Sequence, residues 1–252
     1  MFEQLWLIPL GFVAGILGSI IGFGGGTIIV PILTFAGFSP TLAVSNSLFA
    51  AFSNSVASTV MYAKQKRIEF SLGWKLGLIA VPGTILGAII SSDLSPEIFK
   101  ILLALILLSS ASYILLNRKI KEKPLDVSRM LLVFSAGASF FSGIISSIFG
   151  VGGGIIYVPL MVVALGISMK RAAPTSQFIL MFACFSGLIA HSMLGHPDYY
   201  QALLLSIGAF AGGILGARLS LEIKETKLKI MVIIVIVAAA IKLIIDSTTD
   251  IF

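Results

Sequence analysis

The chain contains one glycine-rich sequence twice, near the start of each half. Residues 15–31 and 143–159 align without a gap, with GFGGG at positions 22–26 and GVGGG at positions 150–154, and both copies end in proline. Roughly half the chain separates the copies, which indicates a duplicated unit and not a short solenoid repeat. Matched glycine breaks in duplicated hydrophobic segments are typical of membrane transporters whose substrate binds between the two copies.

The composition predicts an all-α integral membrane protein. Hydrophobic residues make up 58% of the 252 residues and charged residues only 11%, which leaves too little polar surface for a water-soluble domain. The net charge of +6 comes from short basic loops between apolar segments, a pattern of cytoplasmic loops and not of a nucleic-acid-binding patch. The first residues lack the basic region of a signal peptide.

Enzymatic and metal-binding functions find no support in the sequence. Cys184 is the only cysteine, which excludes an internal disulfide, and no Cys or His spacing suits a zinc site. There is no Walker loop, nucleophile elbow or HExxH motif, so neither an enzyme nor an ATP-driven pump is indicated. We expect no catalytic residue, no metal and no cofactor.

Each half contains the same series of apolar segments. Their predicted positions are 5–22, 27–37, 41–62, 72–91 and 97–116 in the first half and 130–149, 155–165, 172–193, 200–220 and 227–245 in the second. Most approach the ~20 residues of a spanning helix, but 27–37 and 155–165 are about half that length. Each of these two follows a glycine run, and we predict a half-length helix that either returns from mid-membrane or crosses at a strong tilt.

The charges of the loops predict how the two halves face. Four basic clusters all lie in the cytoplasm if the chain starts outside the plasma membrane, and they include Lys66, Lys121, Lys170 and Lys227. An odd number of segments per half then inverts the second copy relative to the first and places both termini outside. We expect two inverted repeats in one intertwined transmembrane domain, residues 1–117 and 130–252, joined by a basic cytoplasmic linker at 118–129.

The two glycine runs are candidate anion-binding sites. Glycine leaves the backbone uncovered and adopts positive φ, and the helix that follows begins with unpaired N–H groups and a partial positive charge. The candidate backbone ligands are Gly24, Gly25, Gly26 and Thr27 in the first half and Gly152, Gly153, Gly154 and Ile155 in the second. Glycines at four-residue spacing, such as Gly11 with Gly15, Gly83 with Gly87 and Gly212 with Gly216, are assigned to helix packing instead.

A polar cluster early in the third segment of each half is the second part of the candidate site. Asn46 and Ser47 match Thr175 and Ser176 in the repeat alignment, and Gln177 follows. Hydroxyl and amide groups can complete the hydrogen bonds of an anion and keep the pocket neutral. The alternative role of these residues is hydrogen bonding between helices.

Titratable side chains are scarce within the segments. Every Asp and Glu lies at or beyond a segment end, so no buried carboxylate is available for a proton relay and export driven by the membrane potential is expected. His191 is the titratable candidate and is predicted to lie at the membrane interface. Tyr62 is assigned to the interfacial aromatic belt. The polar residues at 53–55 have no polar match beyond Cys184 and are ranked below the cluster at Asn46.

These motifs resemble the TauE/SafE family of sulfite exporters, also called the sulfonate-uptake permease superfamily. The resemblance rests on the paired glycine motifs, on Pro31, on the residues at 45–47 and on their partners in the second half, and it covers nearly the whole chain. It implies a prokaryotic-type plasma-membrane carrier for small sulfur-containing or carboxylate anions. Asn46 departs from the family, in which a threonine often precedes the serine, whereas Thr175 and Ser176 keep the pattern.

We therefore predict a secondary carrier that exports a small sulfur-containing oxyanion, such as sulfite, sulfoacetate or another organosulfonate, by alternating access. Its expected partners are the anionic substrate and the lipid bilayer, without nucleic acid. Three alternatives remain open at this point: a passive anion channel with a similar site, a carrier for a non-sulfur carboxylate anion, and a structural subunit that packs against a partner.

Overall fold

The computed structural model contains helices and no strand over the residues that it describes, which are 4–91, 94–116, 129–222 and positions 234, 237, 240 and 241. The helices are α1 (Leu7–Ile21), α2 (Gly26–Phe35), α3 (Pro40–Lys64), α4 (Phe70–Ser91), α5 (Pro96–Leu116), α6 (Arg129–Phe149), α7 (Gly154–Pro159), η2 (Leu160–Ala164), α8 (Met169–Met193) and α9 (Tyr199–Leu219). Their bounds agree with the predicted segments to within a few residues. The predicted segment 227–245 and the linker at 118–129 lie almost entirely outside the described residues.

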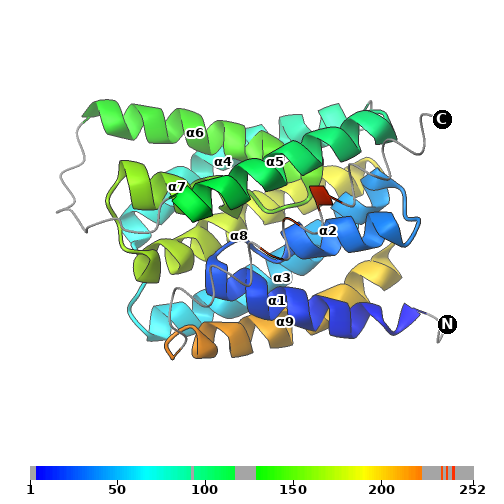
Figure 1. Cartoon of the computed structure of the whole chain (residues 1–252), viewed down its shortest axis with the longest axis horizontal. Coiled ribbons are helices and arrows are strands. Elements are labelled where there is room, and N and C mark those ends of the chain that lie inside the picture. The colour runs from blue at the N-terminus through cyan, green and yellow to red at the C-terminus, as the bar shows by residue number, and fades with distance from the viewer. Residues whose placement is uncertain are drawn as a thin grey trace.

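The segment that follows each glycine run is a half-length helix. α2 has 10 residues, and α7 with 6 residues continues into the five-residue π-helix η2. Neither is long enough to span a bilayer alone. The ring centroids of Trp6 and Phe38 are 6.4 Å apart, so the start of α1 lies beside the end of α2 and the two helices form a hairpin. α2 extends from the middle of the bundle towards one end and α7 towards the other (Figure 1).

Two helix pairs border the bundle, and two long helices fill its middle. α1 packs along α9 at one edge and α6 along α4 at the opposite edge, with α3 and α8 between them (Figure 1). A Cβ on Gly11, Gly83 or Gly212 would collide with a backbone carbonyl of the facing helix. Small residues at such positions let helix backbones approach closely in a membrane. The assignment of these glycines to packing is confirmed.

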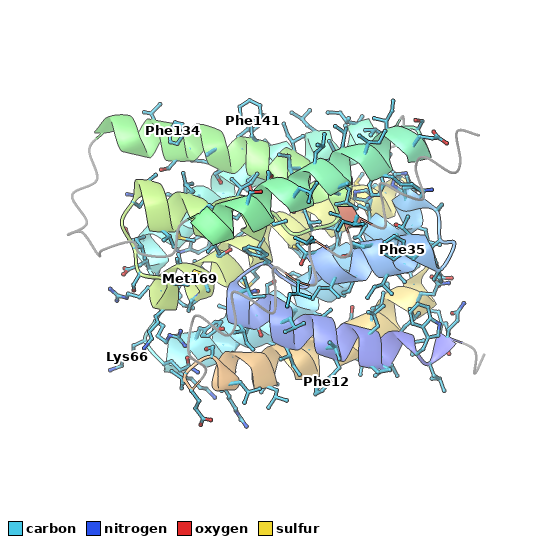
Figure 2. The ribbon with its side chains drawn as sticks, viewed as in Figure 1. Phe12, Phe35, Lys66, Phe134, Phe141 and Met169 are labelled. Carbon is cyan, nitrogen blue, oxygen red and sulfur yellow. The ribbon has the colours of Figure 1, made fainter. Side chains whose placement is uncertain are left out.

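Three segments meet around Arg67 at one end of the bundle, which we call the basic end. Arg67, which follows α3, donates hydrogen bonds from Nε to the Lys170 carbonyl (2.9 Å) and from Nη1 to Oγ of Ser220 (2.8 Å). Lys170 lies at the start of α8 and Ser220 directly after α9. Figure 2 shows Lys66 and Met169 at this same end. The arrangement agrees with the sequence-based placement of these basic segments on one side of the membrane.

The opposite end of the bundle joins the start of α3 to the end of α8. The N–H of Asp198, which follows α8, donates to Oδ1 of Asn46 (3.1 Å). Nδ2 of Asn46 also donates to Oε1 of Gln201 in α9 (3.0 Å). Figure 2 shows Phe35 at this end, away from Lys66. The end of α3 therefore lies beside the start of α8, and the start of α3 lies beside the end of α8. The two helices are antiparallel.

Large apolar side chains cover the outside of the bundle, and hydroxyl groups lie inside it. Phe134 and Phe141 of α6 are each 63% exposed and point away from the bundle (Figure 2), whereas Ser142 and Ser146 of the same helix are buried. This distribution is the reverse of that in a water-soluble helix. Within the described residues, three helices, α4, α8 and α9, are long and apolar enough to cross a membrane. The fold is that of a multi-pass membrane protein.

Candidate functional site

Both glycine runs turn through the left-handed region of backbone space. α1 ends at Ile21, and the chain reverses before α2 begins at Gly26. Three glycines with φ between +64° and +88° make each turn, Gly22, Gly24 and Gly25 in the first half and Gly150, Gly152 and Gly153 in the second. Other residues rarely adopt these angles without strain. The repeated glycines therefore give the chain the same tight reversal twice.

The two turns touch each other in the middle of the molecule. A Cβ on Gly26 would collide with the carbonyl of Gly150, and a Cβ on Gly154 would collide with the carbonyl of Gly22. Gly26 and Gly154 are the first residues of α2 and α7. The turns thus exchange equivalent contacts, and the beginnings of the two short helices lie side by side.

Two serines bind the turns from the central helices. Oγ of Ser47 in α3 donates to the carbonyl of Gly150 (2.9 Å), and Oγ of Ser176 in α8 donates to the carbonyl of Gly22 (2.7 Å). Each serine therefore holds the turn of the other half of the chain. Nε2 of Gln177 donates to the carbonyl of Gly18 (2.7 Å), just before the first turn. Two of the five predicted polar side chains thus bind the glycine turns, and a third binds the helix just before the first turn.

The other two predicted side chains bind loops at the ends of the bundle. Oγ1 of Thr175 accepts from the N–H of Glu69 (3.0 Å) and donates to the carbonyl of Arg171 (2.7 Å). Asn46 binds Asp198 and Gln201 at the opposite end. Asn46 and Thr175 are equivalent in the repeat alignment, and each holds the loop that follows the equivalent helix of the other half. In this conformation they position loops and do not contact the turns through any hydrogen bond.

Backbone N–H groups at both turns lack an acceptor. In the described part of the chain, no carbonyl or side chain accepts a hydrogen bond from the N–H groups of Gly25, Gly26 and Thr27, or from those of Gly153, Gly154 and Ile155. Such groups at the start of a helix attract anions, and inside a membrane an unsatisfied N–H is unfavourable by several kcal/mol. Two sets of unpaired donors therefore lie on the two turns that contact each other, and no cationic side chain of the described residues binds either turn.

Every predicted site residue is buried. The Leu180 side chain closes the space between the turns, since its Cδ1 would lie 2.9 Å from a Cβ on Gly24 and its Cδ2 3.5 Å from one on Gly152. No sequence signal pointed to Leu180, because one leucine in an apolar helix carries no pattern of its own. Its counterpart in the first half is the smaller Ala51, whose Cβ would be 3.8 Å from one on Gly24.

Sequence analysis misplaced two side chains, and a third has an environment that the sequence did not indicate. Tyr62 and His191 were expected at the interface, but both are fully buried and contact backbone carbonyls of α1 and α6. They lie near helix ends, where sequence position alone resembles an interfacial location. Asn54, which was ranked low, is fully buried, and neither polar atom of its amide has a partner among the described residues.

Residues 7–243 match the protein family described as "Sulfite exporter TauE/SafE". The chain belongs to this family. It is similar to a probable membrane transporter protein of Bacillus subtilis, YunE, with 28% identity over 96% of this chain and 97% of the relative. A probable membrane transporter protein of Methanocaldococcus jannaschii is 31% identical over 91% and 92% of the two chains. Escherichia coli YfcA, also called a probable membrane transporter protein, is 26% identical over 98% and 93%.

The family resemblance stated from the glycine motifs is confirmed over most of the chain. TauE/SafE proteins and these relatives are membrane transporters and not enzymes. No solved structure matches the chain. The substrate of this member and the residues that bind it are therefore matters of inference from its own geometry.

Proposed function

We propose that this TauE/SafE protein is a secondary carrier that exports a small sulfur-containing oxyanion across the plasma membrane by alternating access. Sulfite, sulfoacetate and other organosulfonates are the substrates considered. The observation that carries the proposal is the meeting of two sets of unpaired, buried backbone N–H groups at the glycine turns. A negatively charged oxyanion offers these donors several acceptor oxygens at once.

The substrate site in this proposal consists of backbone and neutral side chains. The donors are the amides at Gly24 to Thr27 and at Gly152 to Ile155, of which the Gly24 amide now donates to the carbonyl of Gly18 (3.3 Å). The hydroxyl and amide groups of Asn46, Ser47, Thr175, Ser176 and Gln177 support them. The serine hydroxyls now bind the carbonyls of the turns, at 2.9 Å for Ser47 and 2.7 Å for Ser176. They can turn to an anion when the two turns separate. A site without a fixed positive charge releases an anion more readily than a cationic one.

Two inverted repeats, residues 1–117 and 130–252, joined by the linker 118–129, explain why equivalent contacts occur in pairs. Support comes from the antiparallel course of α3 and α8, and from the reciprocal bonds of Ser47 and Ser176. The hairpin of α1 and α2 fits a re-entrant segment that leaves and returns to one membrane face. With the basic end in the cytoplasm, both termini lie outside.

The burial of the site favours a carrier over an open channel. Asn46, Ser47, Thr175, Ser176 and Gln177 are all 0% exposed, so in this conformation no aqueous path reaches them from either end. An anion can enter only when helices move apart on one side. A carrier alternates between two such openings, whereas a channel needs both at once. The passive channel and a carrier for a non-sulfur carboxylate anion are the alternatives to be tested.

Counterflow in proteoliposomes tests this proposal. We expect the purified chain alone to take up radiolabelled sulfite against its gradient when the vesicles are preloaded with unlabelled sulfite. An open channel gives no counterflow, and a structural subunit gives no flux. Competition by formate, sulfate and sulfoacetate then defines the class of anion. If formate competes for transport and unlabelled sulfite and sulfoacetate do not, the substrate is a carboxylate anion and not a sulfur-containing one.

A further inference from the structure

Two side chains at opposite ends of the bundle make the same contact with equivalent helices. The hydroxyl of Tyr62, near the end of α3, donates to the carbonyl of Ser19 in α1 (2.8 Å). Nε2 of His191, near the end of α8, donates to the carbonyl of Ser147 in α6 (3.0 Å). Ser19 and Ser147 are matching positions of the duplicated sequence, three residues before the first glycine of each turn. Both side chains are fully buried, and each binds the helix that leads into a glycine turn.

Each of these side chains is covered by a residue five positions later. Cζ of Arg67 lies 5.2 Å from the centroid of the Tyr62 ring. At the other end, the ring centroids of His191 and His196 are 5.0 Å apart, and their Nδ1 atoms are separated by 2.8 Å. The two ends therefore share one layout, a buried ring that touches the helix before the turn and a second nitrogen-containing group above it.

The two covering groups differ in charge. The guanidinium of Arg67 stays protonated even though burial lowers its pKa, because arginine does not lose its proton in proteins. Burial also lowers the pKa of His196, which makes its imidazole mostly neutral near pH 7. Of these two covering groups, Arg67 at the basic end thus carries a permanent positive charge beside the buried ring.

Arg67 has neutral hydrogen-bond partners. Its nitrogens donate to the Lys170 carbonyl (2.9 Å), to Oε1 of Gln65 (3.0 Å) and to Oγ of Ser220 (2.8 Å). No carboxylate of the described residues forms an ion pair with it, and Glu69 is already paired with Arg171 at 2.6 Å. A half-buried guanidinium without a counter-ion binds oxyanions well, because it offers two parallel N–H donors.

We propose that Arg67 is the capture site for the substrate anion at the basic end of the bundle and that Tyr62 is the gate between this site and the first glycine turn. The inference rests on the proposed function, since it supposes that the substrate is an anion. An anion that displaces the Ser220 hydroxyl or the Lys170 carbonyl from Arg67 also breaks bonds that hold α3, α8 and α9 together at this end. Capture therefore loosens the contacts that must part for the site to open inward.

The neutral pair at the other end completes this scheme. His191 and His196 close the outer end in the same way but offer the anion no permanent charge. An anion that leaves the glycine turns through this end meets no permanent positive charge and is not retained. An anion that arrives at the basic end is bound by Arg67. The asymmetry favours binding from the cytoplasm and release to the outside, in agreement with export.

Vesicles of defined orientation test the inference. Initial rates of radiolabelled sulfite transport are measured in everted and right-side-out membrane vesicles that contain the full chain. Because hydrogen bonds to a charged group are stronger than neutral ones, we expect Arg67→Gln to raise the KM at the cytoplasmic face about tenfold. The KM at the outer face should not change. Arg67→Lys should restore part of the affinity, and Lys64→Gln, which removes an exposed charge from the last turn of α3, should have no effect.

The reverse change provides a second arm that does not depend on the folding of an Arg67 variant. We expect His196→Arg to lower the KM at the outer face and to leave the cytoplasmic KM unchanged. An equal rise of both KM values in Arg67→Gln, or no rise in either, would overturn the inference, as would an outer KM that does not respond to His196→Arg. Absence of saturable sulfite flux in the unmodified protein would instead overturn the proposed function itself.

Discussion

Leu180 packs against Gly24 so closely that a methyl group on the glycine would lie 2.9 Å from Cδ1 of the leucine. The same side chain reaches Gly152 of the other turn, so one isobutyl group from α8 contacts both glycine turns. In the proposed carrier, the part of the substrate beyond its anionic head occupies this region. The size of the residue at position 180 then limits the size of the substrate.

We expect Leu180→Ala to improve the transport of bulkier organosulfonates relative to sulfite. The measurement is competition against radiolabelled sulfite uptake by alkanesulfonates of increasing length. Ile179→Ala is the control, since Ile179 is also fully buried but adjacent in sequence and so on a different face of α8. Each truncation of a buried side chain costs about 2–5 kcal/mol of stability, so both variants need a comparison of thermal unfolding. If both variants accept longer alkanesulfonates equally well, the side chain of Leu180 does not limit the size of the substrate.

The serines that hold the turns should contribute to stability in equal measure. Ser47→Ala and Ser176→Ala each leave a buried glycine carbonyl without its donor, which costs about 1–3 kcal/mol. Ser45→Ala is the matched control, because within the described part of the chain the Ser45 hydroxyl binds the carbonyl of Leu42 in its own helix and no residue of the other half. Thermal unfolding in detergent should show a clear loss for the first two variants and little for the third. Comparable losses of stability in all three variants would mean that the hydrogen bonds between the halves contribute no more than a hydrogen bond within one helix.

Filling the turns should abolish transport. We expect this result for Gly25→Val and Gly153→Val, because both positions have positive φ and a side chain there would collide with Ala14 of α1 or with Ser142 of α6, which displaces the turn and its N–H groups. Thr27→Val should have a milder effect, since it removes a hydroxyl and keeps the amide. Gly137→Val is the control, because a Cβ at Gly137 has no neighbouring atom within 4 Å. Normal sulfite flux through folded valine variants would show that the anion binds elsewhere.

Cysteine labelling can test the predicted topology. In a Cys184→Ser background, cysteines at positions 66 and 170 should react from the cytoplasmic side, and a cysteine at position 37 from the outside. Lys66 and Lys170 belong to the basic end joined by Arg67, whereas position 37 lies between α2 and α3 at the other end. Labelling of positions 66 and 170 from opposite sides of intact cells would contradict the inverted repeats.

Transport should respond to the membrane potential. Outward movement of one negative charge through an inside-negative potential yields about 2.3 kcal/mol per 100 mV, and about 1.4 kcal/mol corresponds to a tenfold gradient. We therefore expect electrogenic sulfite flux in proteoliposomes with a clamped potassium potential and no pH gradient. His191 is the buried titratable group that would support the opposite result. Flux that follows only a proton gradient, and loses that response in His191→Gln, would indicate proton coupling.

Helix positions and the glycine turns were predictable because both depend on local properties of the chain. Apolar length indicates where a helix spans, and the run at 22–26 can reverse direction only because its glycines accept positive φ. The contact of the turns was foreseeable only in part. The duplicated glycine motifs predicted two sites that face each other. The bonds of Ser47 and Ser176 to the opposite turn, however, depend on how the two halves pack.

The sequence by itself determined an all-helical membrane protein with two half-length helices, and it pointed to the TauE/SafE family. Only the tertiary structure decided that Tyr62 and His191 are buried against equivalent carbonyls, that Leu180 lies between the turns, and that Arg67 joins three segments. The physical reason is the distance along the chain. Hydropathy and backbone preference act on neighbouring residues, whereas the bonds of Tyr62 and His191 join positions 43 and 44 residues apart, and the bond of Ser176 to Gly22 joins positions 154 apart.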